Sequence, residues 1–311
     1  MPFRGLVSEP RFQPQFLGPR YWSHGALIGL IWFATLIPRQ AAGQMGARLG
    51  DLFRRGNPKR RHIAATNLRL CFPEFDEETR QHMLVEHFRA YGRSIIDLGL
   101  VWWASANRLE RLCQIRGLDA WLDRANAGER TLLVTPHTTG MDLGGVCLSR
   151  FYPLVSMMKR VRNPLLTWRL WCGRRRFGAQ IVLRDDGIRP LVRSLVQGRA
   201  GYLMPDEDLR EARTVFAPFF GVQTATLSVV GRLSRLTGAK VLPVFTRRLD
   251  HGHYEVEIHP PLDGFPTGDD MNDASRVNEV FEAGIRLAPE QYLWTLQWFK
   301  NRPDSMPSPY T

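Results

Sequence analysis

The residue pair best suited to acid–base chemistry in this sequence is His137 and Asp142, which lie five positions apart. They follow the apolar segment 131–135, which has the composition of a buried strand, and Asp142 stands where the next helix is expected to begin. Ligands bind beyond the ends of such strands. There an imidazole could take a proton from a bound hydroxyl group, and a carboxylate could fix its tautomer and stabilise its charge. The spacing therefore predicts a general base, with a hydrogen-bonded structural histidine as the alternative.

A long segment without carboxylates follows this pair. Between Asp142 and Asp185 the sequence has nine basic residues, which are Arg150, Lys159, Arg160, Arg162, Arg169, Arg174, Arg175, Arg176 and Arg184. Trp168 and Trp171 stand among them, so the segment is amphipathic as well as cationic. We expect it to contact an anionic lipid surface or a polyanionic substrate, unless it is only a solvated basic face.

An acidic cluster of Asp206, Glu207 and Asp208 follows another short apolar segment. Two carboxylates there could bind a metal, pair with the basic segment, or end a strand in a turn. Because no further His or Asp spacing supports a metal, we expect ion pairing or positioning of a substrate and no metal site. The sequence also has no P-loop, no GxGxxG after a strand and no GxSxG, so it predicts neither a nucleotide cofactor nor a serine hydrolase.

The overall charge narrows the class of partner. The chain of 311 residues has a formal net charge of +12, which favours a negative partner such as nucleic acid, an anionic lipid or an acidic carrier protein. With 44% hydrophobic residues it can bury a substantial core, so a disordered basic chain is excluded.

Short apolar runs that alternate with helix-like segments predict the elements that position these residues. The expected strands are 114–117, 131–135, 154–158, 180–183, 200–204, 240–245 and 254–259. The expected helices are 76–104, 141–150, 164–177, 188–196, 225–236 and 274–287. This alternation predicts an α/β domain with a mixed sheet flanked by helices.

A membrane helix is expected to precede this domain. Residues 21–37 carry no formal charge, and their number is at the short end of what spans a bilayer. The segment therefore either spans the membrane or lies at its interface. Three arginines precede it and seven basic residues follow within 39–61, which favours a cytoplasmic body. We therefore expect an anchoring segment, 1–38, and a catalytic domain, 39–311.

Several blocks, taken in order, resemble the late acyltransferases of lipid A biosynthesis, the lauroyl and myristoyl transferases, within the lysophospholipid acyltransferase superfamily. The similarity extends from about residue 25 to the end of the chain. The blocks are AATNLRLCFPE (64–74), HxxxxD at His137, CGRRRFGAQIVLRDDGIRP (172–190), MPDEDLREARTVFAPFFGVQTATLSVVGRL (204–233), VLPVF (241–245) and PEQYLWTLQWFKNRP (289–303).

The resemblance implies a cofactor-free transfer of a fatty acyl group from acyl-acyl carrier protein to a hydroxyl of a lipid A precursor, at the cytoplasmic face of the bacterial inner membrane. By that analogy His137 is the general base, Asp142 its orienting carboxylate, and Arg174 the group that stabilises the oxyanion or a substrate phosphate. Substrate-binding roles are expected for the remaining matched residues, Arg176, Arg184, Asp206 and Asp208.

Two features differ from the family pattern. Most lauroyl-type members have glutamate where this chain has Asp142, although aspartate also occurs in myristoyl-type members. Leu209, Arg210 and Glu211 replace the usual glycine-proline turn. The implied partners are a carrier protein, an anionic glycolipid and the membrane, without nucleic acid. The alternatives are an acyltransferase for another lipid (a lysophospholipid, an aminolipid or a glycolipid) and a non-catalytic basic membrane- or RNA-binding protein.

Overall fold

The computed structural model describes residues 9–208, 214–303 and 306–310. The departure at residues 209–211 lies outside these ranges. The α-helices are α1 (Trp22–Ala34), α2 (Arg39–Gly56), α3 (Pro58–Cys71), α4 (Glu77–Trp103), α5 (Ala106–Leu112), α6 (Leu118–Asn126), α7 (Met141–Leu148), α8 (Pro164–Arg174), α9 (Arg189–Val196), α10 (Val229–Thr237) and α11 (Asp270–Arg286). The strands are β1 (Cys113–Arg116), β2 (Thr131–Val134), β3 (Leu154–Met158), β4 (Gln180–Leu183), β5 (Ala200–Leu203), β6 (Thr214–Phe219), β7 (Val222–Leu227), β8 (Lys240–Arg248) and β9 (Tyr254–Ile258).

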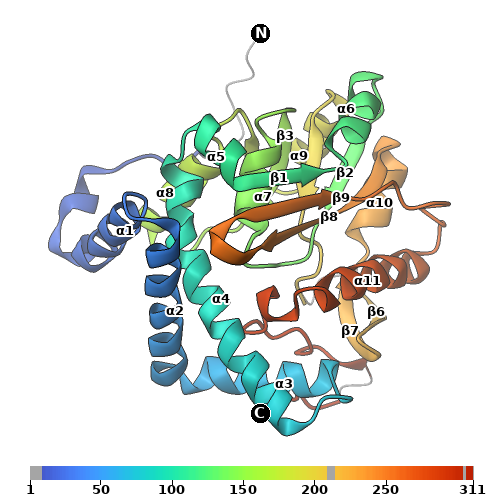
Figure 1. The fold of residues 1–311 in the computed structure, drawn as a ribbon. Coiled ribbons are helices and arrows are strands. Elements are labelled where there is room, and N and C mark those ends of the chain that lie inside the picture. Colours follow the sequence, from blue (N-terminus) through green and yellow to red (C-terminus); the bar gives the residue numbers. More distant parts are fainter. Residues whose placement is uncertain (1–8, 209–213, 304–305, 311) are drawn as a thin grey trace.

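Seven strands form the central sheet, in the order β1-β9-β8-β2-β5-β3-β4 (Figure 1). The five strands from β8 to β4 run parallel to one another, whereas β9 is antiparallel to β8 and pairs in parallel with β1. The expected mixed sheet is confirmed. Because the parallel strands end at one edge, the loops after β2, β3, β4 and β5 gather there.

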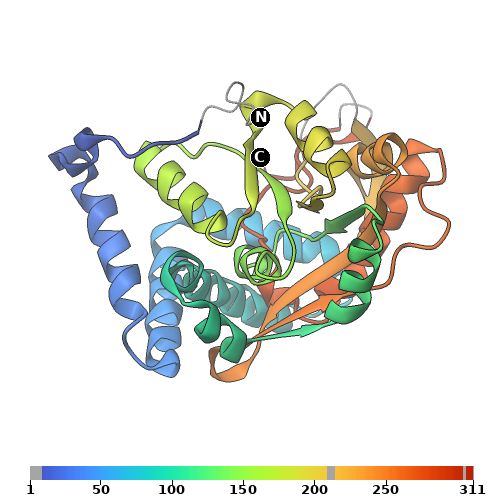
Figure 2. The ribbon, with the colours of Figure 1, turned by 90° about the horizontal axis from the view of Figure 1, so that it is seen from above.

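Helices cover both faces of this sheet (Figure 2), which explains why its strands read as continuous apolar runs. All four residues of β2 are buried, with Leu132 and Val134 in one core and Leu133 in the other. The first core also contains residues of α9, α10 and α11, and the second contains residues of α5 and α7. β2 is therefore fixed from both faces, and so is the loop that follows it.

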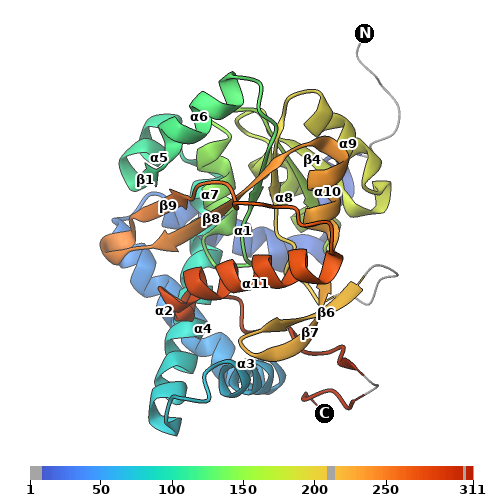
Figure 3. The same ribbon diagram turned by 90° about the vertical axis from the view of Figure 1, so that its right-hand side faces the viewer.

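One expected helix is partly wrong. Residues 225–227, expected as the start of a helix, belong instead to β7, and α10 begins at Val229. β6 and β7 form a separate antiparallel hairpin beside α11 (Figure 3). The antiparallel partner explains the difference, because residues 222–227 pair with β6 along their whole length. α2 and α3 were not expected at all, whereas the long helix expected at 76–104 is confirmed as α4.

The expected transmembrane helix is also not found: none of the helices in the described part of the chain has the length and apolar composition needed to cross a bilayer. α1 has 13 residues. At the end of α1, the Thr35 hydroxyl donates to the Trp32 carbonyl, and Arg108 donates to the Thr35 carbonyl. The next helix, α2, begins at Arg39. Ile31 packs on α4, where a Cβ atom at Gly99 would lie 2.8 Å from the Ile31 carbonyl oxygen.

Candidate active site

Two neighbouring parallel strands bring His137 and Asp206 together. β2 pairs with β5 so that Val134 stands opposite Leu203, and the segments that follow the two strands leave the sheet at the same edge. His137 lies three residues after β2 and Asp206 three residues after β5. The His137 ring nitrogen Nδ1 is 2.6 Å from Asp206 Oδ1, and the His137 backbone N–H donates to Oδ2 at 2.8 Å. One carboxylate thus fixes both the ring and the backbone of this histidine.

These contacts define the protonation of the imidazole. A carboxylate can only accept hydrogen bonds, so Nδ1 carries the proton and Nε2 of the neutral ring carries a lone pair. Burial lowers the pKa of His137, but the charge and hydrogen bond of Asp206 outweigh it, so the pKa lies above its ordinary value. Glu207 adds to this rise, and Arg174 opposes it. The side chain of Asp206 is only 4% exposed, which protects the pair from solvent screening.

Asp142 is not the partner of the histidine. Its Oδ1 atom accepts a hydrogen bond from Arg174 Nε at 2.8 Å, and no hydrogen bond or ion pair joins it to His137, both residues lying in the described ranges. The expected pairing of His137 with Asp142 is therefore corrected. The physical reason is that Asp142 lies in the first turn of α7, facing the end of α8, whereas Asp206 leaves the strand next to that of His137.

The pair of Asp142 and Arg174 lies close enough to His137 for Arg174 to affect its pKa. Both side chains are partly buried, at 20% and 17% exposure. Tyr202 supports α7 from β5, because its hydroxyl donates to the Met141 carbonyl at 2.8 Å. The arginine is therefore held in place near the base by its Nε. Its terminal N–H groups have no hydrogen-bond partner among the described residues, so they can donate to a further acceptor.

The other expected substrate-binding residues have contacts within the protein. The Arg176 guanidinium donates to the carbonyls of Leu100, Val101 and Ala104, and so caps the last turn of α4. Arg184, after β4, pairs with Glu207 at 3.1 Å. The expected pairing between the basic and acidic segments is confirmed at this position.

Asp208 has a different neighbour. Its carboxylate accepts from the backbone and side-chain amides of Asn301, at 2.8 and 2.6 Å, and burial raises its pKa. Asp206, Glu207 and Asp208 therefore have three separate partners: the base, the basic loop after β4, and the C-terminal part of the chain.

A C-terminal strap, residues 289–301, completes the site and was not expected from the sequence to contact it. Leu293 N–H donates to the His137 carbonyl at 3.0 Å, and Thr139 N–H donates to the Gln291 carbonyl at 2.8 Å. The Tyr292 hydroxyl donates to Asp206 Oδ2 at 3.0 Å. The Trp298 ring lies 5.9 Å from the His137 ring, centroid to centroid. The motif block at 289–303 was the available signal, but nothing in the spacing placed it beside His137.

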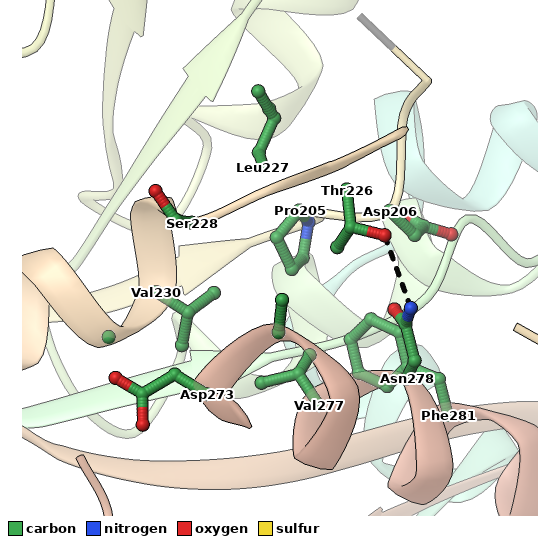
Figure 4. A pocket seen from close by; sticks show the side chains of 12 residues that line it. Pro205, Asp206, Thr226, Leu227, Ser228, Val230, Asp273, Val277, Asn278 and Phe281 are labelled. Atoms are coloured by element: carbon green, nitrogen blue, oxygen red, sulfur yellow. Dashed lines mark hydrogen bonds between the residues drawn. The ribbon is translucent and has the colours of Figure 1, made fainter. Parts of the chain in front are cut away.

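The segment that carries Asp206 also packs near β7, α10 and α11. A small pocket lined by Pro205, Asp206 and both apolar and polar side chains lies between the end of β7, α10 and α11 (Figure 4). The Asn278 amide donates to the Pro218 carbonyl and the Thr226 hydroxyl, and so ties α11 to the hairpin β6–β7 beside this segment. The aspartate is thus placed by packed elements on both sides.

Comparisons with known proteins identify the family of this chain. The sequence profile described as "Bacterial lipid A biosynthesis acyltransferase" matches residues 9–301. The chain belongs to this family. The acyltransferase is 34% identical over 301 residues to the lipid A biosynthesis palmitoleoyltransferase of Escherichia coli K12, covering 96% of this chain and 97% of that one. It is 32% identical over 307 residues to the lauroyltransferase of the same organism, covering 98% and 100%, and 31% identical over 310 residues to the myristoyltransferase, covering 97% and 94%.

Membership of this family rules out the non-catalytic alternative and makes the protein an acyltransferase. The match covers His137, Asp142, Arg174, Asp206 and the strap. The relatives differ in the acyl group that their names give, so the comparisons leave the acyl group of this enzyme open.

Proposed function

We propose that the enzyme transfers a fatty acyl group from the thioester of acyl-acyl carrier protein to a hydroxyl of a lipid A precursor. The observation that carries the proposal is the imidazole of His137, whose Nδ1 is held by Asp206 so that Nε2 can act as a base beside Arg174. The side chain of His137 is 17% exposed, so a substrate can reach it.

The proposed reaction is a direct transfer with both substrates bound. Nε2 of His137 takes the proton of the acceptor hydroxyl as its oxygen attacks the thioester carbonyl carbon. Arg174 stabilises the tetrahedral oxyanion. The intermediate then expels the carrier thiolate, which takes the proton from His137 and leaves as a thiol. Asp206 stabilises the imidazolium throughout, and Asp142 acts by holding Arg174.

The charged loops around the site support the choice of substrates. Lys159, Arg162 and Arg189 are exposed on the loops and helix that follow β3 and β4, at the sheet edge where His137 lies. Such a surface suits an acidic carrier protein and an acceptor bearing phosphates.

Mass spectrometry of lipid A from cells with and without the gene tests the proposal, because lipid A from cells without the gene must lack one acyl chain. Assays with a lysophospholipid, an aminolipid and another glycolipid test the alternative acceptors.

We expect Arg174→Ala to lower kcat/KM for acyl transfer. The loss of transition-state stabilisation should be about 2 to 4 kcal/mol, which is the cost of removing one oxyanion donor. Arg174→Lys should also lose much of the activity, because lysine keeps the charge without the planar fork that Asp142 holds at Nε. Steady-state rates at two salt concentrations measure both effects.

Arg160→Ala is the matched control, since Arg160 is an exposed arginine that pairs with Asp185 on the loop after β3. Equal, salt-sensitive losses at Arg174 and Arg160 would show a diffuse electrostatic effect and contradict the specific role.

We also propose that the enzyme works at the cytoplasmic face of the inner membrane, with α1 against the lipid. Trp22, Trp32, Phe33 and Leu36 of α1 and its end are 49% to 65% exposed, although the opposite side of the helix packs on α4. Arg11 and Arg20 are exposed in the segment that precedes α1. Exposed aromatics flanked by arginines are typical of a helix that binds an anionic lipid surface.

Replacing Trp22, Trp32 and Phe33 together by serine should weaken binding to vesicles of neutral phospholipid more than binding to vesicles with anionic phospholipid, because the basic loops still bind the latter at low salt. Vesicle flotation measures both. Leu236→Ser is the control, since Leu236 is 69% exposed on α10. If the triple variant bound both vesicles like the wild type, α1 would not be the membrane contact.

A further inference from the structure

We propose that Tyr292 is a positioning residue for the catalytic base, acting through the hydrogen bond from its hydroxyl to Asp206. This inference rests on the proposed function of His137 and adds a third member to the pair of His137 and Asp206.

The first step is the place of the strap. Its backbone is bonded to the catalytic turn on both sides of Tyr292, through Gln291 to Thr139 and through Leu293 to His137. Tyr292 itself forms an isolated antiparallel bridge with Thr138. The backbone of Tyr292 is therefore fixed against the residues that carry the base.

The second step is the environment of the phenol. Tyr292 is fully buried, and its ring stacks on Trp298 with centroids 4.9 Å apart and lies edge-on to Trp294 at 4.7 Å. Burial and the charge of Asp206 raise its pKa well above the ordinary value, so the hydroxyl keeps its proton and can only donate to the carboxylate.

The third step is the effect on Asp206. Its carboxylate accepts from the His137 ring, the His137 backbone and the Tyr292 hydroxyl. The hydroxyl shares Oδ2 with the backbone N–H and withdraws charge from the carboxylate. Without it, the carboxylate would attract the imidazolium more strongly, and His137 would hold its proton to a higher pH. The other charged groups that act on His137, Glu207 and Arg174, would be unchanged.

The test is the pH profile of kcat/KM for Tyr292→Phe. Because the base must be neutral, the rate rises with pH through the pKa of His137. This rising part of the profile is its acidic limb. Loss of one hydrogen bond should move the acidic limb to higher pH by about half a pH unit, so kcat/KM at a given pH on the limb falls about threefold. 3-Fluorotyrosine at position 292, a stronger donor of the same shape, should move the limb downward.

Tyr254→Phe is the matched control. Tyr254 is buried and donates its hydroxyl to a carboxylate, Asp97, in the contact between β9 and α4. We expect this variant to lose stability without moving the acidic limb. A purely structural role for Tyr292 predicts the same behaviour, so an unmoved limb in both Tyr292 variants would overturn the inference. The fluorotyrosine variant decides the matter if phenylalanine at position 292 prevents folding.

A readout without turnover separates this inference from the proposed function. NMR of protein labelled with ¹⁵N-histidine gives the pKa of His137 directly, with His137→Gln to identify its signal. If the wild type transferred no acyl group but this pKa still rose in Tyr292→Phe, the proposed function would fail and the role of Tyr292 would stand. If acyl transfer depended on His137 while both Tyr292 variants titrated like the wild type, only the inference would fail.

Discussion

His137→Ala should lower kcat for acyl transfer by a factor of about 10²–10⁴, because the variant has no group to take the proton of the acceptor hydroxyl. The loss should be similar across the pH range in which the wild type is active. Rates with a purified acyl-carrier-protein thioester and a lipid A precursor measure it.

Folding should be little affected. The imidazole is partly exposed, and the backbone bonds of the turn to Asp206 and Leu293 remain. Thermal unfolding and vesicle binding serve as controls. A folded His137→Ala protein with the turnover of the wild type would refute the mechanism.

Asp206→Asn should cause a second large loss, of about 10³–10⁴ in kcat, comparable with the loss caused by the equivalent change in a catalytic triad of another enzyme family. The amide lacks the charge that stabilises the imidazolium. It also presents an N–H₂ group to donors that need an acceptor, namely the His137 N–H groups and the Tyr292 hydroxyl. The pKa of His137 should fall, because Asp206 is the main group that raises it.

Asp142→Asn is the discriminating comparison. If Asp142 acts through Arg174, its loss should be smaller than that of Asp206→Asn and should leave the acidic limb of the pH profile unmoved. If Asp142→Asn instead moved the limb and Asp206→Asn did not, the histidine would be paired with Asp142 during turnover, as the sequence motif first suggested.

Much of the fold could be predicted from local patterns. Each of the seven expected strands overlaps a strand of the central sheet, and the amphipathic stripe at 76–104 gave α4. The hairpin β6–β7 was missed because VQTATLSVV also fits a helix when the antiparallel partner is unknown. The apolar run at 21–37 was wrongly given as a possible transmembrane helix. Its composition gives no sign that the contact of Arg108 with Thr35 lies at the end of a helix of only 13 residues.

The site was predictable residue by residue but not as a set of pairs. His137, Asp142, Arg174 and Asp206 were all selected from the sequence, but Asp142 was expected to orient His137, and Asp206 was expected to bind substrate. The near neighbour in sequence, Asp142, bonds Arg174, and the partner of His137 lies 69 residues away. Their proximity depends on β2 and β5 being adjacent in the sheet, and strand order is not encoded in any local spacing.

The strap also determines when the site can form during synthesis. The catalytic turn at 137–139 is bonded to residues 291–293, about 150 positions later in the chain, and the central sheet also needs β8 and β9. Contacts between such distant segments form late, and a chain still on the ribosome has no partner for them. A nascent chain therefore has its base without the strap that holds it, and catalytic competence arises only after residues 289–301 have left the ribosome.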